Sequence, residues 1–384
     1  MKIMFSAGEA SGDMHGANLV RALRQLDPAI ECIGMGGHLM ANAGVKIVYD
    51  IQHLGVIGVG EIIKKIPFFF KLRDLLVQVM KDEKPDVVIL IDYPGFNMRL
   101  MKKIKELGIP VIYYILPTIW AWNKSRGPVI ASYADLAVSM FPFERDIYKA
   151  LGTNVIYAGH PLLDTVRPTM SKEEGLAYFG LDRAKKTVLL MPGSRLQEVE
   201  GLLPCMLEAA KRMQEQDSSL QFLLPKAGTI SRDLLWKYVK ESGVDVTIGQ
   251  DHVYDMMHVS TAAIAASGTA TLETALMELP TLLIYRVNAL TYWLAKLLVH
   301  VENIGLPNII MGKRIMPELW QHEVTPENIA QEVLPMLEDE ARHQELQQAM
   351  AAVRQTMGEP GAVGRIAQQI YTFVKERQKA HESN

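Results

Sequence analysis

The sequence contains little cysteine: its two cysteines, Cys32 and Cys205, lie far apart and lack the spacing of metal ligands. We therefore expect no disulfide framework, and a reducing compartment. Long apolar runs are also missing, because no stretch approaches the roughly 20 apolar residues of a membrane-spanning helix. Residues 1–5 lead directly into a glycine-rich turn, without the apolar core of a signal peptide. We therefore expect a cytoplasmic protein.

Charge of one sign is not in excess either, since 40 Lys and Arg residues stand against 43 Asp and Glu residues, a formal net charge of −3. A near-neutral chain offers no general polyanion-binding surface, and nucleic acid is not expected as a partner. The 49% of hydrophobic and 22% of charged residues are typical of a folded globular protein. A chain of 384 residues suits two domains of middling size.

What the sequence does contain is a repeated pattern, in which an apolar run of strand length precedes a helical pattern. Most of these runs are continuous rather than alternating, as expected for parallel strands that are covered on both faces. The pattern predicts an α/β protein with two doubly wound, Rossmann-like domains and parallel sheets. The predicted strands lie near residues 2–6, 30–34, 46–49, 87–91, 111–115, 135–139, 154–157, 187–191, 220–224, 244–248, 262–266 and 281–285.

The domain junction is expected in the stretch 160–172, which gathers Pro, Gly and a helix-start signal. We predict an N-terminal domain over 1–165, a C-terminal domain over 166–360 and a last helix in 361–384. That helix carries an apolar stripe, so it should cross back to the N-terminal domain or pack on a partner subunit; a homodimer is favoured. Ligands of open α/β sheets bind beyond the carboxyl ends of the strands, which places a site in a cleft between the domains.

The first candidate for phosphate binding is the stretch TVLLMPGSRLQEVEGLLP, residues 187–204, where a buried strand ends in a glycine turn before a helix. Main-chain N–H groups at a helix start attract anions, and a guanidinium adds two more donors. The residues concerned are Gly193, Ser194 and Arg195. Neither a Walker A motif nor the dinucleotide fingerprint is present. The alternative is an ordinary turn with a solvated arginine.

A second strand–glycine–helix turn follows in AAIAASGTATLETALMELP, residues 262–280. Its small residues Ser267, Gly268, Thr269 and Thr271 could turn amides toward a second phosphate. Glu273 is expected in the first helical turn, where a carboxylate suits ribose hydroxyls better than phosphate. Alternatively, Glu273 favours the helix dipole and Thr271 only caps the helix. Together the two turns indicate a nucleoside diphosphate.

No Asp-X-Asp motif and no His/Asp cluster with metal-ligand spacing is present in the sequence. We therefore expect no metal and no cofactor. Helix dipoles and Arg195 would then carry the charge of a departing diphosphate.

Seven segments, taken in chain order from residue 1 to near residue 330, closely resemble the lipid-A-disaccharide synthase family: SAGEASGDMHGANL, LIDYPGFNMRL, YYILPTIWAW, AGHPLLDTV, MPGSRLQEVEGLLP, ASGTATLETAL and LPNIIMGKRIMPELWQHEVTPENIA. The resemblance implies an inverting glycosyltransferase of GT-B architecture, in which the two domains face a central cleft. It implies that UDP-2,3-diacylglucosamine, a substrate rather than a cofactor, is joined to 2,3-diacylglucosamine 1-phosphate. The products would be the β-1,6-linked lipid A disaccharide 1-phosphate and UDP.

Inverting transfer needs a carboxylate that takes the proton of the acceptor hydroxyl. Asp92 follows a very apolar strand in VVILIDYPGFN, and Pro94 and Gly95 end that strand. Partial burial at this position would raise the pKa of Asp92 toward that of a useful base. The alternative is that Asp92 starts the turn or caps the next helix. With the resemblance we favour catalysis.

The opening loop FSAGEASGDMHG, residues 5–16, carries carboxylates that repel phosphate and accept hydrogen bonds from hydroxyl groups. We expect it on the acceptor side, facing Asp92, with Glu9 orienting a sugar and having a catalytic role. The alternative is that Asp13 caps the first helix and His15 sits satisfied in the wall. The acceptor-side residues are Gly8, Glu9, Ser11, Gly12, Asp13 and His15.

Weaker candidates follow from the family patterns Leu306-Pro307-Asn308 and Glu-x-x-Gln. Asn308 is expected to bind sugar or phosphate. Glu318 and Gln321 are expected one helical turn apart on the same cleft; the alternative is an ordinary polar helix face. His160 is expected to serve the geometry of the domain junction.

The stretch 55–80, GVIGVGEIIKKIPFFFKLRDLLVQVM, mixes basic residues with aliphatic and aromatic ones, as a segment in the interface of an anionic membrane does. We expect two short helices broken at Pro67 and peripheral contact with the cytoplasmic face of the inner membrane. The apolar stripe alone favours helices that cover the sheet, but three consecutive phenylalanines cannot all face one core. The membrane candidates are Ile62, Ile63, Lys64, Lys65, Ile66, Phe68, Phe69 and Phe70.

Two other kinds of protein stay open at this point. One is another UDP-sugar enzyme of GT-B shape, either an epimerase or a lipid-linked transferase. The other is a non-catalytic nucleotide-sugar sensor that docks on membranes. The apolar stretch 289–301 could contact acyl chains or pack internally.

Overall fold

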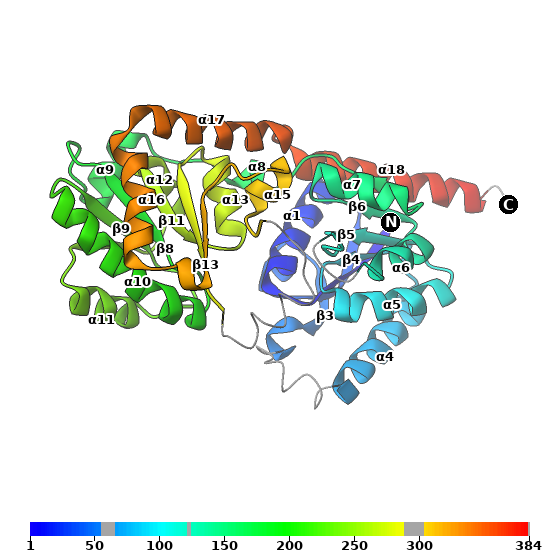
Figure 1. The fold of residues 1–384 in the computed structure, drawn as a ribbon. Coiled ribbons are helices and arrows are strands. Elements are labelled where there is room, and N and C mark those ends of the chain that lie inside the picture. The colour runs from blue at the N-terminus through cyan, green and yellow to red at the C-terminus, as the bar shows by residue number, and fades with distance from the viewer. Residues whose placement is uncertain (55–65, 121–123, 288–302, 383–384) are drawn as a thin grey trace. The chain divides into compact units, whose positions relative to one another are not determined.

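In a computed structural model, the chain is described over residues 1–54, 66–120, 124–287 and 303–382. It forms two compact units, drawn in Figure 1. The first comprises Met1–Pro161 together with Glu359–Asn384, and the second comprises Leu162–Gly358. None of the helices in the described part of the chain is long and apolar enough to cross a membrane.

The first unit is built on a seven-stranded parallel sheet with the order β3-β2-β1-β4-β5-β6-β7. All strands predicted for this half of the chain are present, with ends that differ by at most two residues. They are β1 (Lys2–Ala7), β2 (Glu31–Gly36), β3 (Lys46–Asp50), β4 (Val87–Ile91), β5 (Val111–Tyr114), β6 (Leu136–Val138) and β7 (Val155–Ile156).

Both faces of this sheet are covered, which explains the continuous apolar runs in the sequence. Met4, Val88 and Leu90 pack into a cluster with residues of α4 and α5. Their neighbours Phe5 and Ile89, which point to the other face, are also fully buried. The helices of the unit are α1 (Ala10–Leu26), α2 (His38–Asn42), the 3₁₀ turn η1 (Ile51–Leu54), α4 (Ile66–Glu83), α5 (Pro94–Glu106), α6 (Arg126–Tyr133), α7 (Pro142–Ala150) and α18 (Ala362–Glu382).

The last helix, α18, packs against α1 in the first unit. Its apolar stripe, which was expected to need a cover, is buried there: Ile366, Ala367 and Ile370 are fully inaccessible. Arg365 also donates from Nε to the carbonyl oxygen of Ala158 at 2.9 Å. The stripe is thus covered within its own chain, and it no longer supports the homodimer that it led us to favour.

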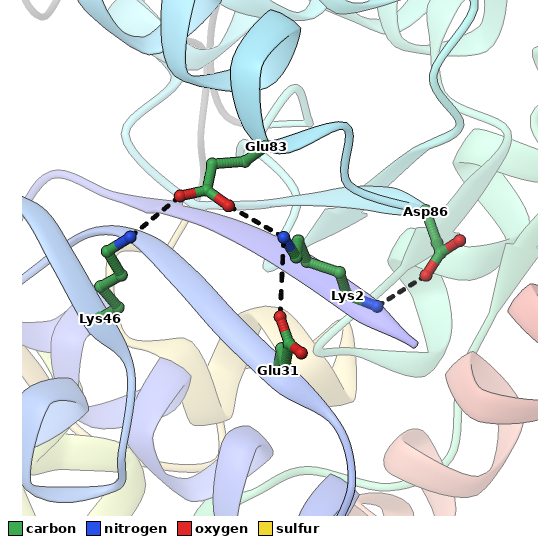
Figure 2. A network of polar contacts seen from close by, with 5 residues as sticks. All are labelled: Lys2, Glu31, Lys46, Glu83 and Asp86. Atoms are coloured by element: carbon green, nitrogen blue, oxygen red, sulfur yellow. Dashed lines mark hydrogen bonds and ion pairs between the residues drawn. The ribbon is translucent and has the colours of Figure 1, made fainter.

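A network of charged side chains lies where the strands of this sheet begin (Figure 2). Glu83, at the end of α4, accepts from Lys2 Nζ at 2.8 Å and from Lys46 Nζ at 2.9 Å. The main-chain N–H of Lys2 donates to Asp86 at 2.6 Å. The two lysines lower the pKa of Glu83 to about 2. The network therefore links β1, β3 and α4, and it leaves the carboxyl ends of the strands unoccupied.

The second unit contains a six-stranded parallel sheet with the order β10-β9-β8-β11-β12-β13. The five strands predicted here are present, and a sixth, β13, was not predicted. The strands are β8 (Thr187–Met191), β9 (Gln221–Pro225), β10 (Val246–Gly249), β11 (Ala262–Ala266), β12 (Thr281–Tyr285) and β13 (Glu318–Trp320).

Helices cover both faces of this second sheet, with one apolar cluster on each face. The long helix α10 packs on α16 over one face, and α9 packs on α12 over the other. The helices are α8 (Leu162–Thr165), α9 (Lys172–Phe179), α10 (Leu196–Gln216), α11 (Arg232–Ser242), α12 (Val253–Val259), α13 (Thr269–Leu276), α15 (Leu306–Met311), the 3₁₀ turn η2 (Gln321–Glu323), α16 (Pro326–Glu338) and α17 (Glu340–Thr356).

The predicted fold class, two doubly wound α/β units with parallel sheets, is confirmed. In each sheet the strand order reverses once along the chain, at β1/β4 and at β8/β11. Such switch points leave a crevice at the carboxyl ends of the two strands. The loops selected from the sequence follow these four strands. That the two sheets face a common cleft stays a prediction.

Candidate functional site

Asp92 stands directly after β4, at the switch point of the first sheet. The strand register pairs Ile91 with Ala7 on one side and with Tyr114 on the other. The residues that follow these strands, Gly8, Asp92 and Ile115, therefore leave the sheet next to one another. Asp92 has φ 45° and Tyr93 has φ 48°, so two successive non-glycine residues adopt the left-handed conformation. Strain of this kind concentrates at functional sites.

The carboxyl group of Asp92 has the electrostatics of a general base. Burial and the charge of Glu9 raise its pKa to about 6, against smaller opposing effects of the Tyr93 N–H and of Arg126. A base with this pKa is mostly ionised at neutral pH and still accepts a proton readily. The competing role as a helix cap is not found, because the N-cap of α5 is Tyr93 and that helix end has no side-chain cap among the described residues.

The glycine at position 8 is required by the aromatic ring of Tyr93. A Cβ atom at Gly8 would lie 2.1 Å from Tyr93 Cδ1, so the opening loop and the Asp92 turn pack directly on each other. Glu9 follows as the N-cap residue of α1 without capping it through its side chain. Glu9 and Ser11 are exposed, while Gly12 is buried against Ala7. Glu9 is thus free to act on the surroundings of Asp92.

Asp13 has a partner that differs from both possibilities raised by the sequence. It is 2% exposed and accepts hydrogen bonds from the main-chain N–H groups of Gly37 (2.7 Å), Leu39 (3.0 Å) and Met40 (3.0 Å). It therefore caps α2, not the first helix, and its oxygens are engaged away from any sugar. The expectation that Asp13 accepts sugar hydroxyls does not fit these contacts.

His15 is held as a neutral ring next to β5. Burial lowers its pKa to about 4, and its ring meets Tyr114 edge-on at 6.3 Å between centroids. Its Nδ1 finds no hydrogen-bond partner in the part of the chain that the structure describes. His160, which belongs to the same unit, is also neutral, because burial lowers its pKa to about 3.

In the second unit, the turn after β8 binds an internal carboxylate. The N–H groups of Ser194 and Arg195 donate to Glu198 Oε2 at 3.1 and 3.2 Å, and Arg195 Nη1 donates to Oε1 at 3.0 Å. Gly193 has φ 109°, and a Cβ atom there would lie 2.3 Å from Glu198 Oε2. The amides that were expected to face a phosphate are thus engaged by the carboxylate of Glu198, and their binding of a phosphate stays a prediction.

The turn after β11 presents a hydroxyl-rich helix start. α13 begins at Thr269 after Gly268, and Thr271 donates from Oγ1 to the carbonyl oxygen of Gly268 at 2.9 Å. Thr271 therefore does not cap the helix, and Glu273 lies in the second turn rather than the first. Tyr254 donates to Glu273 Oε1 at 3.3 Å, and burial raises the pKa of Glu273. The main-chain N–H of Ser267 is already used by Ile284 O of β12.

The expectations for Asn308 and Glu318 require correction. Glu318 begins strand β13, so it does not lie on a helix with Gln321. The buried Glu318 accepts from Ile304 N, Gly305 N, Asn308 Nδ2 and Trp320 Nε1. Asn308 is fully buried, and its Oδ1 accepts from Ile315 N and Met316 N. Both residues hold the loop around α15 and have little capacity left for a ligand.

Gln321 differs from these two residues, because it follows β13 at the carboxyl edge of the sheet. Its Oε1 accepts from the N–H of Val287 at 3.2 Å. Its Nε2 is buried and finds no partner among the described residues. Gln321 therefore retains an unpaired donor, and its role in binding the donor substrate stays a prediction.

Of the membrane candidates, Ile62, Ile63, Lys64 and Lys65 lie outside the described residues, as does the stretch 289–301. Ile66 begins α4, and Pro67 lies in the first turn of that 18-residue helix, where proline is tolerated. Phe68 and Phe69 pack against the core of the first unit. Phe70 is 47% exposed. The three phenylalanines thus divide between core and surface.

No group of three or more His, Cys, Asp and Glu side chains that could hold a metal ion occurs within the described ranges.

A family model described as lipid-A-disaccharide synthetase matches residues 3–370. This chain belongs to the lipid-A-disaccharide synthase family. The lipid-A-disaccharide synthase of Geobacter sulfurreducens is 42% identical over 366 residues, which is 95% of each chain. The resemblance drawn from the seven sequence segments is confirmed.

Solved structures share the fold at low identity. UDP-GlcNAc 2-epimerase from Neisseria meningitidis, bound to UDP-GlcNAc, superposes with a TM-score of 0.66 at 14% identity, covering 97% of this chain and 100% of that one. The glycotransferase of kitacinnamycin has a TM-score of 0.66 at 14% identity, covering 97% and 98%. These neighbours support the GT-B fold, while membership of the synthase family indicates a glycosyltransferase rather than an epimerase or a non-catalytic sensor.

Three residues that contact the candidate site were not predicted from the sequence. Asn97 and Tyr113 bind the main chain of Asp92, and Glu198 occupies the turn at Gly193. Only Glu198 had a local signal, because it stands three residues after the N-cap Arg195, where a capping carboxylate is common. Tyr113 lies within an apolar strand and Asn97 within a helix, and neither position is distinctive in one sequence.

Proposed function

We propose that this chain joins UDP-2,3-diacylglucosamine to 2,3-diacylglucosamine 1-phosphate and forms the β-1,6-linked lipid A disaccharide 1-phosphate and UDP. Membership of the lipid-A-disaccharide synthase family supports the substrates. The observation that carries the mechanism is the carboxyl group of Asp92, held at the switch point of the first sheet with a pKa of about 6.

In the proposed reaction, the oxygen of the acceptor's 6-hydroxyl bonds to the anomeric carbon of the donor. Asp92 accepts the proton of that hydroxyl at the same time. The bond from that carbon to the UDP oxygen breaks, and its electron pair leaves with UDP. Attack from the face opposite UDP inverts the anomeric centre, and the proton on Asp92 passes to water. General-base catalysis of this kind contributes about 10²- to 10⁴-fold in rate.

The second unit would hold the donor. Main-chain amides of Gly193–Arg195 and Gly268–Thr269, with the guanidinium of Arg195, would bind the diphosphate and stabilise its charge as it departs. Glu273 would accept hydrogen bonds from the ribose hydroxyls, and Gln321 would donate its free amide hydrogen. No metal ion has a role in this proposal.

Acylated sugars lie in a bilayer, so the enzyme would need a membrane-contacting surface. The outward face of α4 is the best candidate, because Phe70 and Leu75 are exposed there beside Lys71 and Arg73. The guanidinium of Arg73 lies 5.0 Å from the centre of the Phe70 ring. Apolar and basic side chains together favour the cytoplasmic face of an anionic inner membrane.

The activity is tested by incubating the protein with both acylated glucosamines in detergent micelles and measuring UDP release and disaccharide mass. We expect stoichiometric disaccharide and UDP, with rates unchanged by EDTA. UDP release without disaccharide would refute the proposed acceptor. Loss of activity in EDTA, restored by Mg²⁺, would refute the metal-free mechanism.

The membrane surface is tested with Phe70→Ser, which removes an exposed ring without opening the core. Binding to vesicles containing anionic phospholipid should fall several-fold, while thermal stability and activity in micelles stay unchanged. Tyr178→Ser is the matched control, because Tyr178 is 58% exposed on the second unit. Equal vesicle binding by both variants would show that α4 does not contact the bilayer.

A further inference from the structure

We infer that Tyr113 and Asn97 are positioning residues for Asp92: they fix the peptide group that follows it and thereby aim its carboxylate. The inference rests on the proposed role of Asp92 as the base. Neither residue needs to contact a substrate, because both act on the main chain of Asp92 from neighbouring elements.

The conformation of the turn that carries Asp92 depends on contacts with neighbouring elements. Asp92 and Tyr93 both have positive φ values, 45° and 48°, and side-chain-bearing residues adopt this conformation only when their surroundings impose it. The Asp92 N–H donates to Tyr114 O of β5 at 3.1 Å. That bond fixes the start of the residue but leaves its carbonyl group free to rotate. The direction of the side chain depends on where this carbonyl group is held.

Two buried side chains hold that carbonyl oxygen from different elements. Tyr113, on β5, donates from Oη to Asp92 O at 3.0 Å. Asn97, on α5, donates from Nδ2 to the same oxygen at 2.8 Å. Both side chains are fully inaccessible, so water does not compete for these bonds.

Asn97 is itself fixed by the first strand. Its Oδ1 accepts from Ser6 Oγ at 2.7 Å, and its Nδ2 also lies 3.2 Å from the carbonyl oxygens of Ser6 and Ile91. Every polar atom of the Asn97 side chain is thereby engaged. The network joins β1, β4, β5 and α5 at a single peptide group. An error in aim of about 1 Å is enough to lower catalysis about 100-fold.

A buried tyrosine that merely satisfies a carbonyl oxygen would have the same hydrogen bond without any effect on catalysis. The chain contains such a tyrosine as a matched control. Tyr148 is fully buried in the same unit and donates from Oη to Pro117 O at 2.8 Å. Tyr113→Phe and Tyr148→Phe each remove a phenol oxygen that donates to a main-chain carbonyl oxygen. Only in Tyr113→Phe does that carbonyl oxygen belong to Asp92.

The experiment compares kcat, KM for both substrates, the pH profile and thermal unfolding of the full-length variants. Tyr113→Phe should lower kcat about 10- to 100-fold and leave both KM values within about twofold. The acid limb of its profile should stay near pH 6, because burial and Glu9 still set that pKa. Tyr148→Phe should lose similar stability but keep kcat within about twofold.

Equal kcat losses in the two variants, or a normal kcat in Tyr113→Phe, would overturn the inference. If Tyr113→Phe does not fold, Ser6→Ala, which removes the hydrogen bond to Asn97 Oδ1, should still lower kcat at unchanged KM. A wild-type kcat in Ser6→Ala would then overturn the inference. Asp92→Asn, measured in parallel, separates the proposed base from the positioning inference. Full activity of Asp92→Asn would refute Asp92 as the base. An inactive Asp92→Asn together with a normal Tyr113→Phe would refute only the positioning role.

Discussion

The turn at Asp92 and the turn at Gly193 occupy equivalent switch points of the two sheets, yet they are held in opposite ways. Asp92 is fixed by buried side chains on α5 and β5 that bind its main chain. The Gly193 turn is closed by Glu198 from its own helix, and the Arg195 side chain there is 83% exposed. The buried contacts hold Asp92 firmly, whereas an incoming anion can replace Glu198 at the Gly193 turn.

This difference matches the tasks proposed for the two turns. A base must keep its direction throughout the reaction, so its support has to lie where neither water nor substrate reaches it. A phosphate cradle must release one anion and accept another. The half-buried carboxylate of Glu198, already bound to the amides, keeps the cradle formed and can move aside when a diphosphate arrives. The proposal thus assigns rigidity to one of these loops and anion exchange to the other.

The largest effect is expected for Asp92→Asn. Transfer should fall about 10²- to 10⁴-fold, because the amide cannot accept the proton, while UDP affinity, measured by calorimetry, stays within about twofold. Weaker UDP binding of the same size as the activity loss would contradict the division of tasks between the two turns.

The same variant has a pH signature in stability. The pKa of Asp92 is raised from 3.8 to about 6 in the folded state, so its stabilising contribution exists in acid and is lost as pH rises through 6. Asp92→Asn should therefore raise the free energy of unfolding at pH 8 by an amount on the order of 1 kcal/mol, after discounting for the partial exposure of Asp92, and should raise Tm with it. At pH 4 the two proteins should melt alike. A lower Tm at pH 8 would instead assign Asp92 a structural role.

A comparable but smaller loss is expected for Gly8→Ala. The new methyl group would collide with the Tyr93 ring and displace the rigid turn, which should lower kcat about 10- to 100-fold. Gly95→Ala is the control, because a Cβ atom there meets no atom of the described chain within 4 Å. Similar kcat values for the two variants would indicate that the turn adapts and is not rigid.

An intermediate effect of the opposite sign is expected for Glu198→Gln. The amide can still accept the main-chain hydrogen bonds, but it no longer competes with an incoming anion for Arg195. UDP should bind about threefold more tightly, a modest gain because the Arg195 side chain is largely exposed. Glu208→Gln, on the same helix, is the control. Weaker UDP binding would mean that Glu198 contacts the nucleotide directly.

The smallest effect is expected for Glu9→Gln. Because the charge of Glu9 raises the pKa of Asp92, its removal should move the acid limb of kcat/KM below pH 6 by less than about one pH unit. The plateau should fall a few-fold through the lost sugar contact, with unchanged UDP affinity. An unmoved limb together with a normal plateau would remove Glu9 from the site.

Sequence patterns were sufficient for the strands of the two sheets and for the position of the loops that follow them, because continuous apolar runs indicate buried parallel strands. They failed at β13, a three-residue strand that begins with the buried Glu318. A charged residue in so short an element gives no strand signal. Asp13 was misplaced for a related reason, since its partners belong to the five-residue helix α2, which is distant along the chain.

The network around Asp92 was out of reach for a different reason. In the sequence, Tyr113 is one more residue of an apolar strand, and Asn97 is one more polar residue of a helix. Their meaning depends on strand register, which brings residues some 20 to 90 positions apart to one peptide group. A single sequence does not fix that register.

The return of α18 to the first unit has a consequence for how the protein is made. The second unit is a continuous segment, whereas the first is composed of two segments that lie before and after it. During translation the second unit can fold as soon as it leaves the ribosome, but the part of α1 that packs on α18 stays uncovered until α18 emerges. The half of the enzyme that carries Asp92 is therefore completed last.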